Sequence, residues 1–415
     1  MGSPIATLRQ LRALVRTQGA DYAWRLVRPS PTRRDAPGRL VLIGPRLESS
    51  GAPLVLLDIM RDFAGQRPDL PLVLVAPVVD DDLVGEVDRL GVRRVPALRG
   101  VGPSLIARQL RLAGRDDVLL NTANVPAPYR DHIFDLLEAD ALGAAVWFLH
   151  EMEGSYFEDA ALVARTARLL ADGRLHVVTP SQKAADYYNT LFGSDRVGIV
   201  HLRVTLPAGH QGDHPLADFQ TLRFCSVGTS QRGYKGQFLT IAALATCVPE
   251  LKADPGRYRE FTLDLVGAKE DTYYSRQMAS VAHGLLGDRA TLHAWTSRAE
   301  VVAIEARCNV TLGSSYTETF GLSMAEGMLL GHVLLRNATG GVDEQPRDGV
   351  NGFLIDPTDV AAYGGRLRAL LDRHATPDES LGAMGQVSRE LITPFTTADY
   401  ATQLAPSLLP PSAPA

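Results

Sequence analysis

The chain has 415 residues, of which 45% are hydrophobic and 21% are charged, and this suits a globular protein of two domains of about 150–200 residues each. Its formal net charge of −5 argues against extensive nucleic-acid binding, which requires a basic excess. The sequence has neither an apolar stretch of about 18 residues nor the pattern of a signal peptide, so we expect a cytoplasmic protein.

The first 38 residues differ from the rest of the chain. Apolar residues recur at helical spacing from Ile5 to Val15, with arginines between them, and a Pro/Arg-rich stretch follows at 29–37. One interpretation is a helix that packs its apolar stripe on the body of the protein. The other is a peripheral contact of residues 5–28 with an anionic membrane surface. We favour the packed helix, because local charge patterning alone is weak evidence for membrane binding.

From Arg39 onward, short apolar runs alternate with longer amphipathic segments. The runs predict strands and the segments predict helices, and runs that are apolar on both faces are typical of a buried parallel sheet. The expected strands are Leu40–Ile43, Leu72–Val75, Val118–Leu120, Ala145–Leu149 and His176–Val178, and the helices between them include 51–64, 103–113, 131–142 and 158–171. We therefore predict a doubly wound, Rossmann-like α/β domain over 39–203.

Residues 204–220 are polar and rich in Gly and Pro, and they predict an interdomain linker. A second Rossmann-like domain is expected over 221–390, followed at 391–415 by a helix and a disordered tail. Its expected strands are Leu222–Val227, Phe261–Val266, Ala290–His293, Val310–Leu312 and Val333–Leu335. Two such halves in one chain predict a cleft that the carboxyl ends of both sheets face.

The segment 314–327 carries the strongest chemical signal. Glu318 precedes a helix that we expect to start at Phe320, so its carboxylate is placed at the carboxyl edge of the second sheet. The free N–H groups of Phe320, Gly321 and Leu322 would form a positive helix end that suits a diphosphate. A carboxylate that only caps the helix is the alternative for Glu318.

Glu326 follows Glu318 by eight positions, and Thr319, Phe320 and Gly321 come directly after the first glutamate. This string resembles the signature of the retaining GT-B glycosyltransferases of the large family-four class, also called glycosyl transferases group 1. The resemblance is strong over 221–360 and fainter over 39–203. It implies that Glu318 contacts hydroxyls of the donor sugar and that Glu326 holds the ribose of the donor nucleotide. A solvated helical glutamate is the alternative for Glu326.

A basic, glycine-rich loop follows the first strand of the second domain. Lys235 and Arg232 lie in this loop, where cations would stabilise the charge that develops on a departing nucleotide diphosphate. The loop at 226–237 resembles the phosphate-binding stretch of the same class, although Thr229 stands where that class often has arginine. We expect Lys235 and Arg232 to act in place of a metal ion, and Lys235 is the stronger candidate. An exposed loop without a ligand is the alternative.

The N-terminal half offers two further candidates. Gly51 follows Ser50 between the first expected strand and helix, where the class usually has two adjacent glycines that close over the donor phosphate. His150 comes at the end of a strand, where the resemblance implies a histidine beside the reacting sugar. A plain turn and a structural histidine are the alternatives. Glu151 and Glu153 could orient a polar acceptor or be solvated.

No metal ion or other cofactor is expected. The acidic triplet 80–82 contains an Asp-x-Asp pair, which in the other glycosyltransferase fold holds a divalent cation on the donor phosphates. It precedes a helix that we expect near Leu83, and we favour helix capping and solvation, because aspartates are favourable at such a helix start. The three cysteines lack metal-ligand spacing and are predicted to be reduced core residues. Trp295 follows a strand at a turn that, by the resemblance, lies against the nucleobase, so it is a candidate for stacking on the base.

These observations predict a metal-independent transferase that moves a sugar from a nucleotide diphosphate to an acceptor hydroxyl and retains the anomeric configuration. By the breadth of the class we expect a cell-envelope glycan, a glycolipid or a natural product as acceptor, and the oligomeric state is open. One alternative is an inverting GT-B transferase, or a nucleotide-sugar epimerase, with His150 as its base. The other is a sugar-nucleotide-binding protein without catalytic activity.

Overall fold

The computed structural model describes residues 38–408 except 49, 98–101, 113, 153, 208, 211–217, 230–232 and 269–271. It divides into two compact units. The N-terminal unit runs to Thr179 and includes Ala185–Val200 and the chain from Asp399 onward, and the C-terminal unit comprises Pro180–Ala184 and His201–Ala398. The basic helix and linker expected at 1–38, the membrane contact expected at 5–28 and the tail expected after Leu408 lie outside the described residues, apart from Gly38.

A seven-stranded sheet forms the centre of the N-terminal unit, and every strand in it is parallel to its neighbours. Its order is β3-β2-β1-β4-β5-β6-β7, with β1 paired to both β2 and β4. The strands are β1 (Leu40–Ile43), β2 (Leu72–Ala76), β3 (Arg93–Pro96), β4 (Asp117–Asn121), β5 (Ala144–Phe148), β6 (Leu175–Thr179) and β7 (Gly198–Ile199). β1 is a central strand, because it pairs with a neighbour on each side and its side chains are fully buried.

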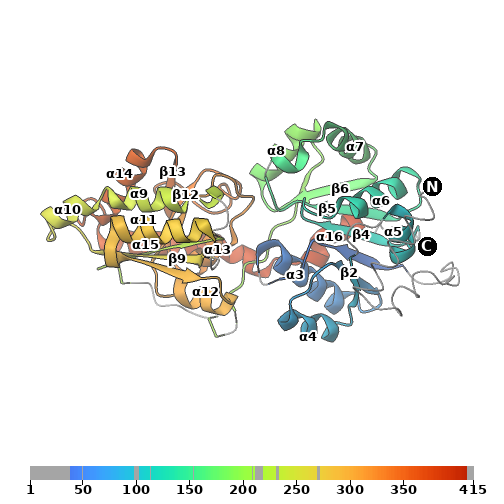
Figure 1. The fold of residues 1–415 in the computed structure, drawn as a ribbon, viewed down its shortest axis with the longest axis horizontal. Helices are drawn as coiled ribbons and strands as arrows, with labels where there is room; N and C mark the ends of the chain where they lie inside the picture. The colour runs from blue at the N-terminus through green and yellow to red at the C-terminus, as the bar shows by residue number, and fades with distance from the viewer. Residues whose placement is uncertain are drawn as a thin grey trace. The chain divides into compact units, whose positions relative to one another are not determined.

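Helices cover this sheet on both faces. They are α3 (Gly51–Gln66), α4 (Asp81–Arg89), α5 (Pro103–Leu110), α6 (Ala127–Glu138), α7 (Ala160–Ala171) and α8 (Gln182–Phe192). Figure 1 shows α7 and α8 on one side of the strands and α3 on the other. The core between the layers includes Trp147, which packs edge-on against Phe134.

The C-terminal unit has a six-stranded parallel sheet of order β10-β9-β8-β11-β12-β13. Its strands are β8 (Leu222–Val227), β9 (Phe261–Ala268), β10 (Ala290–Ala294), β11 (Val310–Gly313), β12 (Val333–Asn337) and β13 (Gly352–Ile355). Its α-helices are α9 (Gln237–Ala245), α10 (Val248–Ala253), α11 (Tyr273–Leu286), α12 (Arg298–Glu305), α13 (Leu322–Leu330), α14 (Val360–Leu371) and α15 (Asp378–Ile392). The two sheets confirm the predicted pair of Rossmann-like, doubly wound α/β domains.

Three strands were not expected from the sequence. They are β3, β7 and β13, and each lies at an edge of its sheet. An edge strand is paired on one side only, so it does not need a continuous apolar run. β3 begins with two exposed arginines, Arg93 and Arg94, and β7 has only two residues. The sequences of β3 and β7 therefore lack the pattern that identifies the central strands, whereas β13 is a short apolar run that was not expected as a strand.

The segment expected as a linker packs partly on the C-terminal unit. Leu206 lies in a small apolar cluster with Val302 and Leu330, and the Val204 N–H donates to the Phe395 carbonyl at 3.1 Å. Residues 204–207 are therefore held by this unit.

The C-terminal helix α16 (Tyr400–Leu408) belongs to the N-terminal unit. It packs against α3 and β5. The Tyr400 N–H donates to the Asp62 carboxylate at 2.8 Å, and the Tyr400 side chain is fully buried. The end of the chain is thus a structural part of the first domain.

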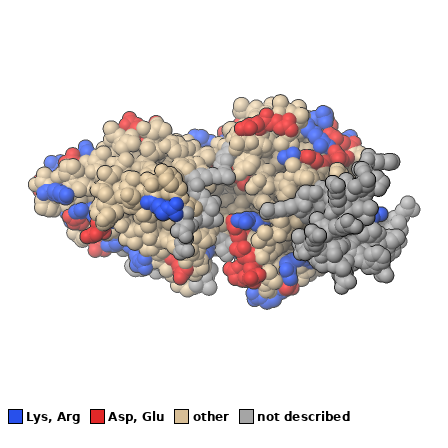
Figure 2. All heavy atoms as spheres, viewed as in Figure 1, with Lys and Arg blue, Asp and Glu red and all other residues tan. Residues whose placement is uncertain are grey.

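The described surface mixes charges of both signs. Arg165, for example, bridges Asp135 and Glu138, and Figure 2 shows basic and acidic groups interspersed on the visible face. Such a face lacks the extended basic surface with which proteins bind nucleic acid. No helix in the described part of the chain is long and apolar enough to cross a membrane. Cys225, Cys247 and Cys308 are free and buried.

Candidate functional site

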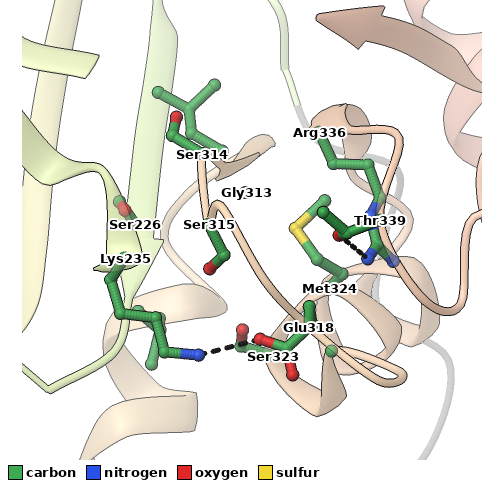
Figure 3. A pocket seen from close by; sticks show the side chains of 13 residues that line it. Ser226, Lys235, Gly313, Ser314, Ser315, Glu318, Ser323, Met324, Arg336 and Thr339 are labelled. Atoms are coloured by element: carbon green, nitrogen blue, oxygen red, sulfur yellow. Dashed lines mark hydrogen bonds and ion pairs between the residues drawn. The ribbon is translucent and has the colours of Figure 1, made fainter. Parts of the chain in front are cut away.

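A pocket lies at the point where the strand order of the C-terminal sheet reverses. β8 and β11 are neighbours, and the chain proceeds from them toward opposite edges. In open α/β sheets, ligands bind at the carboxyl ends of the strands at such a switch point. The pocket has an empty volume of about 360 Å³, including space open to solvent, and is lined by Val227 of β8, Gly313 of β11 and Arg336 of β12. Its lining is mainly hydroxyl and charged side chains (Figure 3).

An ion pair crosses this pocket. The Lys235 Nζ lies 2.8 Å from the Glu318 Oε2, and the two side chains are 21% and 22% exposed. Lys235 ends a short 3-10 turn, η2 (Gly233–Lys235), just before α9. Gly236 follows with φ of 69°, and a Cβ there would lie 2.1 Å from the Ser314 carbonyl oxygen. Only glycine lets the loop approach the 314–318 segment this closely, and this approach sets the distance between lysine and glutamate.

Both members of the pair are charged at neutral pH. Burial is the largest effect on Glu318 and would raise its pKa, but the charge and hydrogen bond of Lys235 and the charge of Arg336 outweigh it, so the pKa lies below 4.5. For Lys235, burial would lower the pKa, and the Glu318 carboxylate outweighs it, so the pKa lies above 10.5. The pocket therefore holds a fixed carboxylate and a fixed ammonium group.

The helix behind Glu318 begins two residues later than the sequence predicted. α13 starts at Leu322 and not at Phe320, because Gly321 has φ of 84°, which a right-handed helix does not allow. The N–H groups without a partner inside the helix are therefore those of Leu322, Ser323 and Met324. Ser323 and Met324 line the pocket, so the positive helix end still faces a site where an anion can bind.

Glu326 does not line the pocket. Its Oε1 accepts two hydrogen bonds from the Arg298 guanidinium, at 2.7 and 3.0 Å, and Arg298 also donates to the Thr205 carbonyl. Burial raises the pKa of Glu326, and Arg298 opposes this shift. The side chain is only 8% exposed. The second glutamate of the motif is thus held in place by an arginine that the sequence did not identify.

The remaining residues predicted for donor binding fall in different places. Gly321 lines the pocket, and Leu322 begins the helix beside it. Thr319 and Phe320 are buried, and the Phe320 ring packs on Phe395 with the ring centroids 5.6 Å apart. Trp295 is 43% exposed at the end of β10 and is not part of this pocket. Arg232 lies outside the described residues.

Arg336, which the sequence did not single out, is a pocket residue. It lies in β12, is 2% exposed, and lines the pocket with Lys235 and Glu318. A charged residue near the carboxyl end of an apolar strand, just before Gly340 and Gly341, was the available signal. The sequence could not show that β12 lies beside β11, which is the relationship that brings Arg336 to Glu318.

In the N-terminal unit, one asparagine links two predicted site residues. Asn121 ends β4, the strand beside β1 at the switch point of this sheet. Its Nδ2 donates to the Ala52 carbonyl at 3.1 Å, and its Oδ1 lies 2.9 Å from the His150 Nε2. Gly51 is the first residue of α3, and a Cβ there would meet no atom within 4 Å. Asn121 therefore connects the start of α3, where Gly51 lies, to His150.

His150 is a neutral imidazole in this setting. Burial lowers its pKa to about 3, and its ring lies 4.1 Å, centroid to centroid, from that of Phe148. Because the Asn121 amide nitrogen donates elsewhere, its oxygen accepts from the His150 Nε2–H, which fixes the tautomer. The Glu151 carboxylate binds the backbone: it accepts hydrogen bonds from the N–H groups of Ala123 and His150 at 2.8 and 3.2 Å.

Within the described ranges, no group of three or more His, Cys, Asp or Glu side chains is arranged to hold a metal ion. Of the acidic triplet, Asp80 is the N-cap of α4, and Asp81 and Asp82 lie in its first turn. The helix thus begins at Asp81, two residues before the position expected. The carboxylates lie at the positive helix end, where they are favourable.

Residues 221–387, which contain the pocket, match the family model described as "Glycosyl transferases group 1". D-inositol 3-phosphate glycosyltransferase 1 of Catenulispora acidiphila is 28% identical over 243 residues, which are 52% of this chain and 51% of that protein. D-inositol 3-phosphate glycosyltransferase of Mycolicibacterium smegmatis is 28% identical over 113 residues, 27% of this chain and 25% of that protein. The chain thus aligns with about half or less of these curated relatives.

Solved structures resemble the chain over most of its length. A glycosyltransferase from Rickettsia africae has a TM-score of 0.67 at 12% identity and covers 91% of this chain and 100% of its own. Anabaena HepE in complex with UDP has a TM-score of 0.66 at 17% identity and covers 89% of this chain and 98% of its own. At these identities the likeness shows the fold, which is that of the GT-B glycosyltransferases, with two parallel-sheet Rossmann-like domains.

Proposed function

We propose that this protein is a glycosyltransferase that moves a sugar from a nucleotide diphosphate to an acceptor hydroxyl, with retention of configuration and without a metal ion. The Lys235–Glu318 pair carries the proposal. It places a fixed cation and a fixed carboxylate 2.8 Å apart, beside the positive end of α13, in a pocket at the switch point of a Glycosyl transferases group 1 domain.

Each group has a distinct task. Lys235 and the amide groups at the start of α13 balance the negative charge that the diphosphate gains as it departs. Glu318 accepts hydrogen bonds from hydroxyls of the donor sugar. The bond between the anomeric carbon and the diphosphate breaks while a bond to the acceptor oxygen forms on the same face, and the acceptor proton passes to the departing phosphate. No protein base is required in this scheme.

We propose a uridine nucleotide as the donor. HepE, a structural neighbour, has been solved in complex with UDP and with UDP-glucose. In this proposal the carboxylate of Glu326 binds the ribose hydroxyls of the donor nucleotide. Arg298 contacts the Glu326 Oε1, and among the described residues no hydrogen bond to the Oε2 competes with a diol.

The acceptor is proposed as a class only. The curated relatives are named for D-inositol 3-phosphate, which favours a phosphorylated polyol as a first acceptor to try. Cell-envelope glycans, glycolipids and natural products are the other acceptors that we propose to screen.

An inverting transferase or an epimerase with His150 as base is the second candidate. The His150 environment disfavours it, because a histidine with a pKa of about 3 binds a proton weakly at neutral pH and is a poor general base. A non-catalytic binding protein is the third candidate, and sustained turnover would exclude it.

The test has two stages. Thermal-shift measurements against UDP-, GDP- and ADP-sugars identify the donor, because a ligand at 100 times its Kd stabilises a protein by about 2.7 kcal/mol. Transfer to the acceptor panel is then followed by NMR of the anomeric proton of the product. Retention of the donor configuration supports the proposal, and inversion, or an epimerised free donor, contradicts it.

A further inference from the structure

Arg336 is the second cation of the pocket, and it approaches Glu318 from the side opposite Lys235. Figure 3 shows Lys235 and Arg336 reaching in from different elements, with Glu318 and Met324 between them. Arg336 comes from β12, and Lys235 comes from the loop before α9. Electrostatically the three groups form one system, since the charges of both cations lower the pKa of Glu318.

The Arg336 guanidinium is fully committed to protein acceptors. Its Nη1 donates to the Phe320 carbonyl at 3.1 Å and to the Gln345 side chain, and its Nη2 donates to the Thr339 Oγ1 at 3.2 Å and the Gly340 carbonyl at 2.6 Å. The Nε points to the Asn337 carbonyl at 3.4 Å. Arg336 therefore has no donor left for a ligand and acts on one through its charge and its neighbours.

These contacts join two turns of the backbone. The 318–321 turn carries Glu318 and leads into α13, and a Cβ on Gly340 would lie 2.2 Å from the Glu318 carbonyl oxygen. The two turns thus pack backbone against backbone, and Arg336 donates to a carbonyl of each. Gln345 supports the same turn without a charge, since its Nε2 donates to the Phe320 and Gly321 carbonyls at 2.8 and 3.2 Å.

Arg336 stays protonated at neutral pH although it is buried. Burial lowers its pKa to about 10, and the carboxylates of Glu318 and Glu344 oppose the shift. At neutral pH it is a fixed cation shielded from bulk water, where electrostatic effects are stronger than in water. Among the described residues, the charged side chains that line the pocket are Lys235, Glu318 and Arg336, and their net charge of +1 favours an anion.

We propose that Arg336 determines the preference of the pocket for a diphosphate over a monophosphate, through the field of its buried charge and without contact to the ligand. It is a positioning and specificity residue, and the inference rests on the proposed uridine nucleotide donor. Each additional phosphate charge interacts favourably with this cation, so the preference for UDP over UMP depends on it.

The experiment compares the Kd of UDP and of UMP by calorimetry for the full chain and four variants. Arg336→Met should reduce the ratio of UMP to UDP dissociation constants at least about 10-fold. Arg336→Lys keeps a positive charge and loses the five-donor guanidinium fork. Because the proposed preference depends on the charge, the ratio should stay within about 3-fold of wild type. Gln345→Leu loosens the same turn without changing a charge and should leave the ratio unchanged. Arg366→Met, at an exposed arginine of α14, is the matched control.

Every outcome decides the inference. If Arg336→Met weakens UDP and UMP equally, or if Gln345→Leu lowers the ratio as much, the role is purely structural and the inference is wrong. If Arg336→Met does not fold, Arg336→Gln replaces it with the same expectation. A wild-type protein that binds neither nucleotide overturns the proposed donor as well, whereas a wild-type preference for UDP that survives Arg336→Met overturns this inference alone.

Discussion

The Lys235 ammonium group lies 2.8 Å from the Glu318 carboxylate across 83 positions of sequence. The strand order of the C-terminal sheet produces this contact, because the loop after β8 and the segment after β11 leave adjacent parallel strands at the same edge. At that edge the Lys235 ammonium group and the Glu318 carboxylate would each contact a different part of a nucleotide sugar. The pair is therefore the centre of the proposed donor site.

Removal of the cation should impair turnover more than folding. Lys235→Met should lower kcat about 10²–10³-fold, because it removes one charge that stabilises the transition state. Steady-state kinetics with the identified donor measure this effect. Lys252→Met, at an exposed lysine of α10, is the control with the same chemical change, and an equal loss in both variants would contradict the role of Lys235.

The ion pair should stabilise the fold over a defined pH window. The pKa of Glu318 is below 4.5 in the folded protein, so its contribution is complete above the unfolded value and is lost as pH falls through the folded value. The pKa of Lys235 is above 10.5, so its contribution is present below 10.5 and is lost as pH rises through the folded value. Urea unfolding of wild type and Glu318→Gln should show a constant difference from about pH 6 to about pH 9 that shrinks below about pH 4. A difference that grows at acid pH would contradict this assignment.

His150 should destabilise the fold at acid pH. Its pKa falls from 6.5 to about 3 on folding, so the stability associated with the neutral ring is present above 6.5 and declines as pH falls toward 3. Wild type should therefore lose more free energy of unfolding between about pH 7.5 and pH 5 than His150→Gln does. His283→Gln, at an exposed histidine of α11, should behave like wild type, and a His150→Gln variant with the wild-type pH dependence would show that the ring is not desolvated.

Glu326 should act on the ribose of the donor. Glu326→Gln should weaken UDP binding at least about 10-fold, the lower end of the value of one hydrogen bond to a charged group. The same substitution should have little effect on a 2′,3′-dideoxy nucleotide, which lacks the diol. Calorimetry with both nucleotides gives this comparison, and Glu379→Gln, at an exposed glutamate of α15, is the control. An equal loss for both nucleotides would remove the ribose assignment.

The sequence predicted the central strands of both sheets well, for physical reasons. Strand β1 is apolar and buried on both faces, so its run is easy to recognise. Lys235 and Glu318 lie in the segments that follow β8 and β11. Arg336 was missed because its role depends on the adjacency of β11 and β12, which no local pattern encodes. The start of α13 was misplaced because the positive φ of Gly321 is not visible in a string of residues. The cleft expected between the two halves stays a prediction.

Binding of UDP to metal-stripped protein tests the central claim most directly. Calorimetry of wild type and Lys235→Met in excess EDTA, and then with added Mg²⁺ or Mn²⁺, requires no acceptor. The account predicts that wild type binds UDP with the same Kd under all three conditions and that Lys235→Met binds at least about 10-fold more weakly. Binding that is lost in EDTA and restored by either metal would contradict a diphosphate site built from protein cations and helix amides.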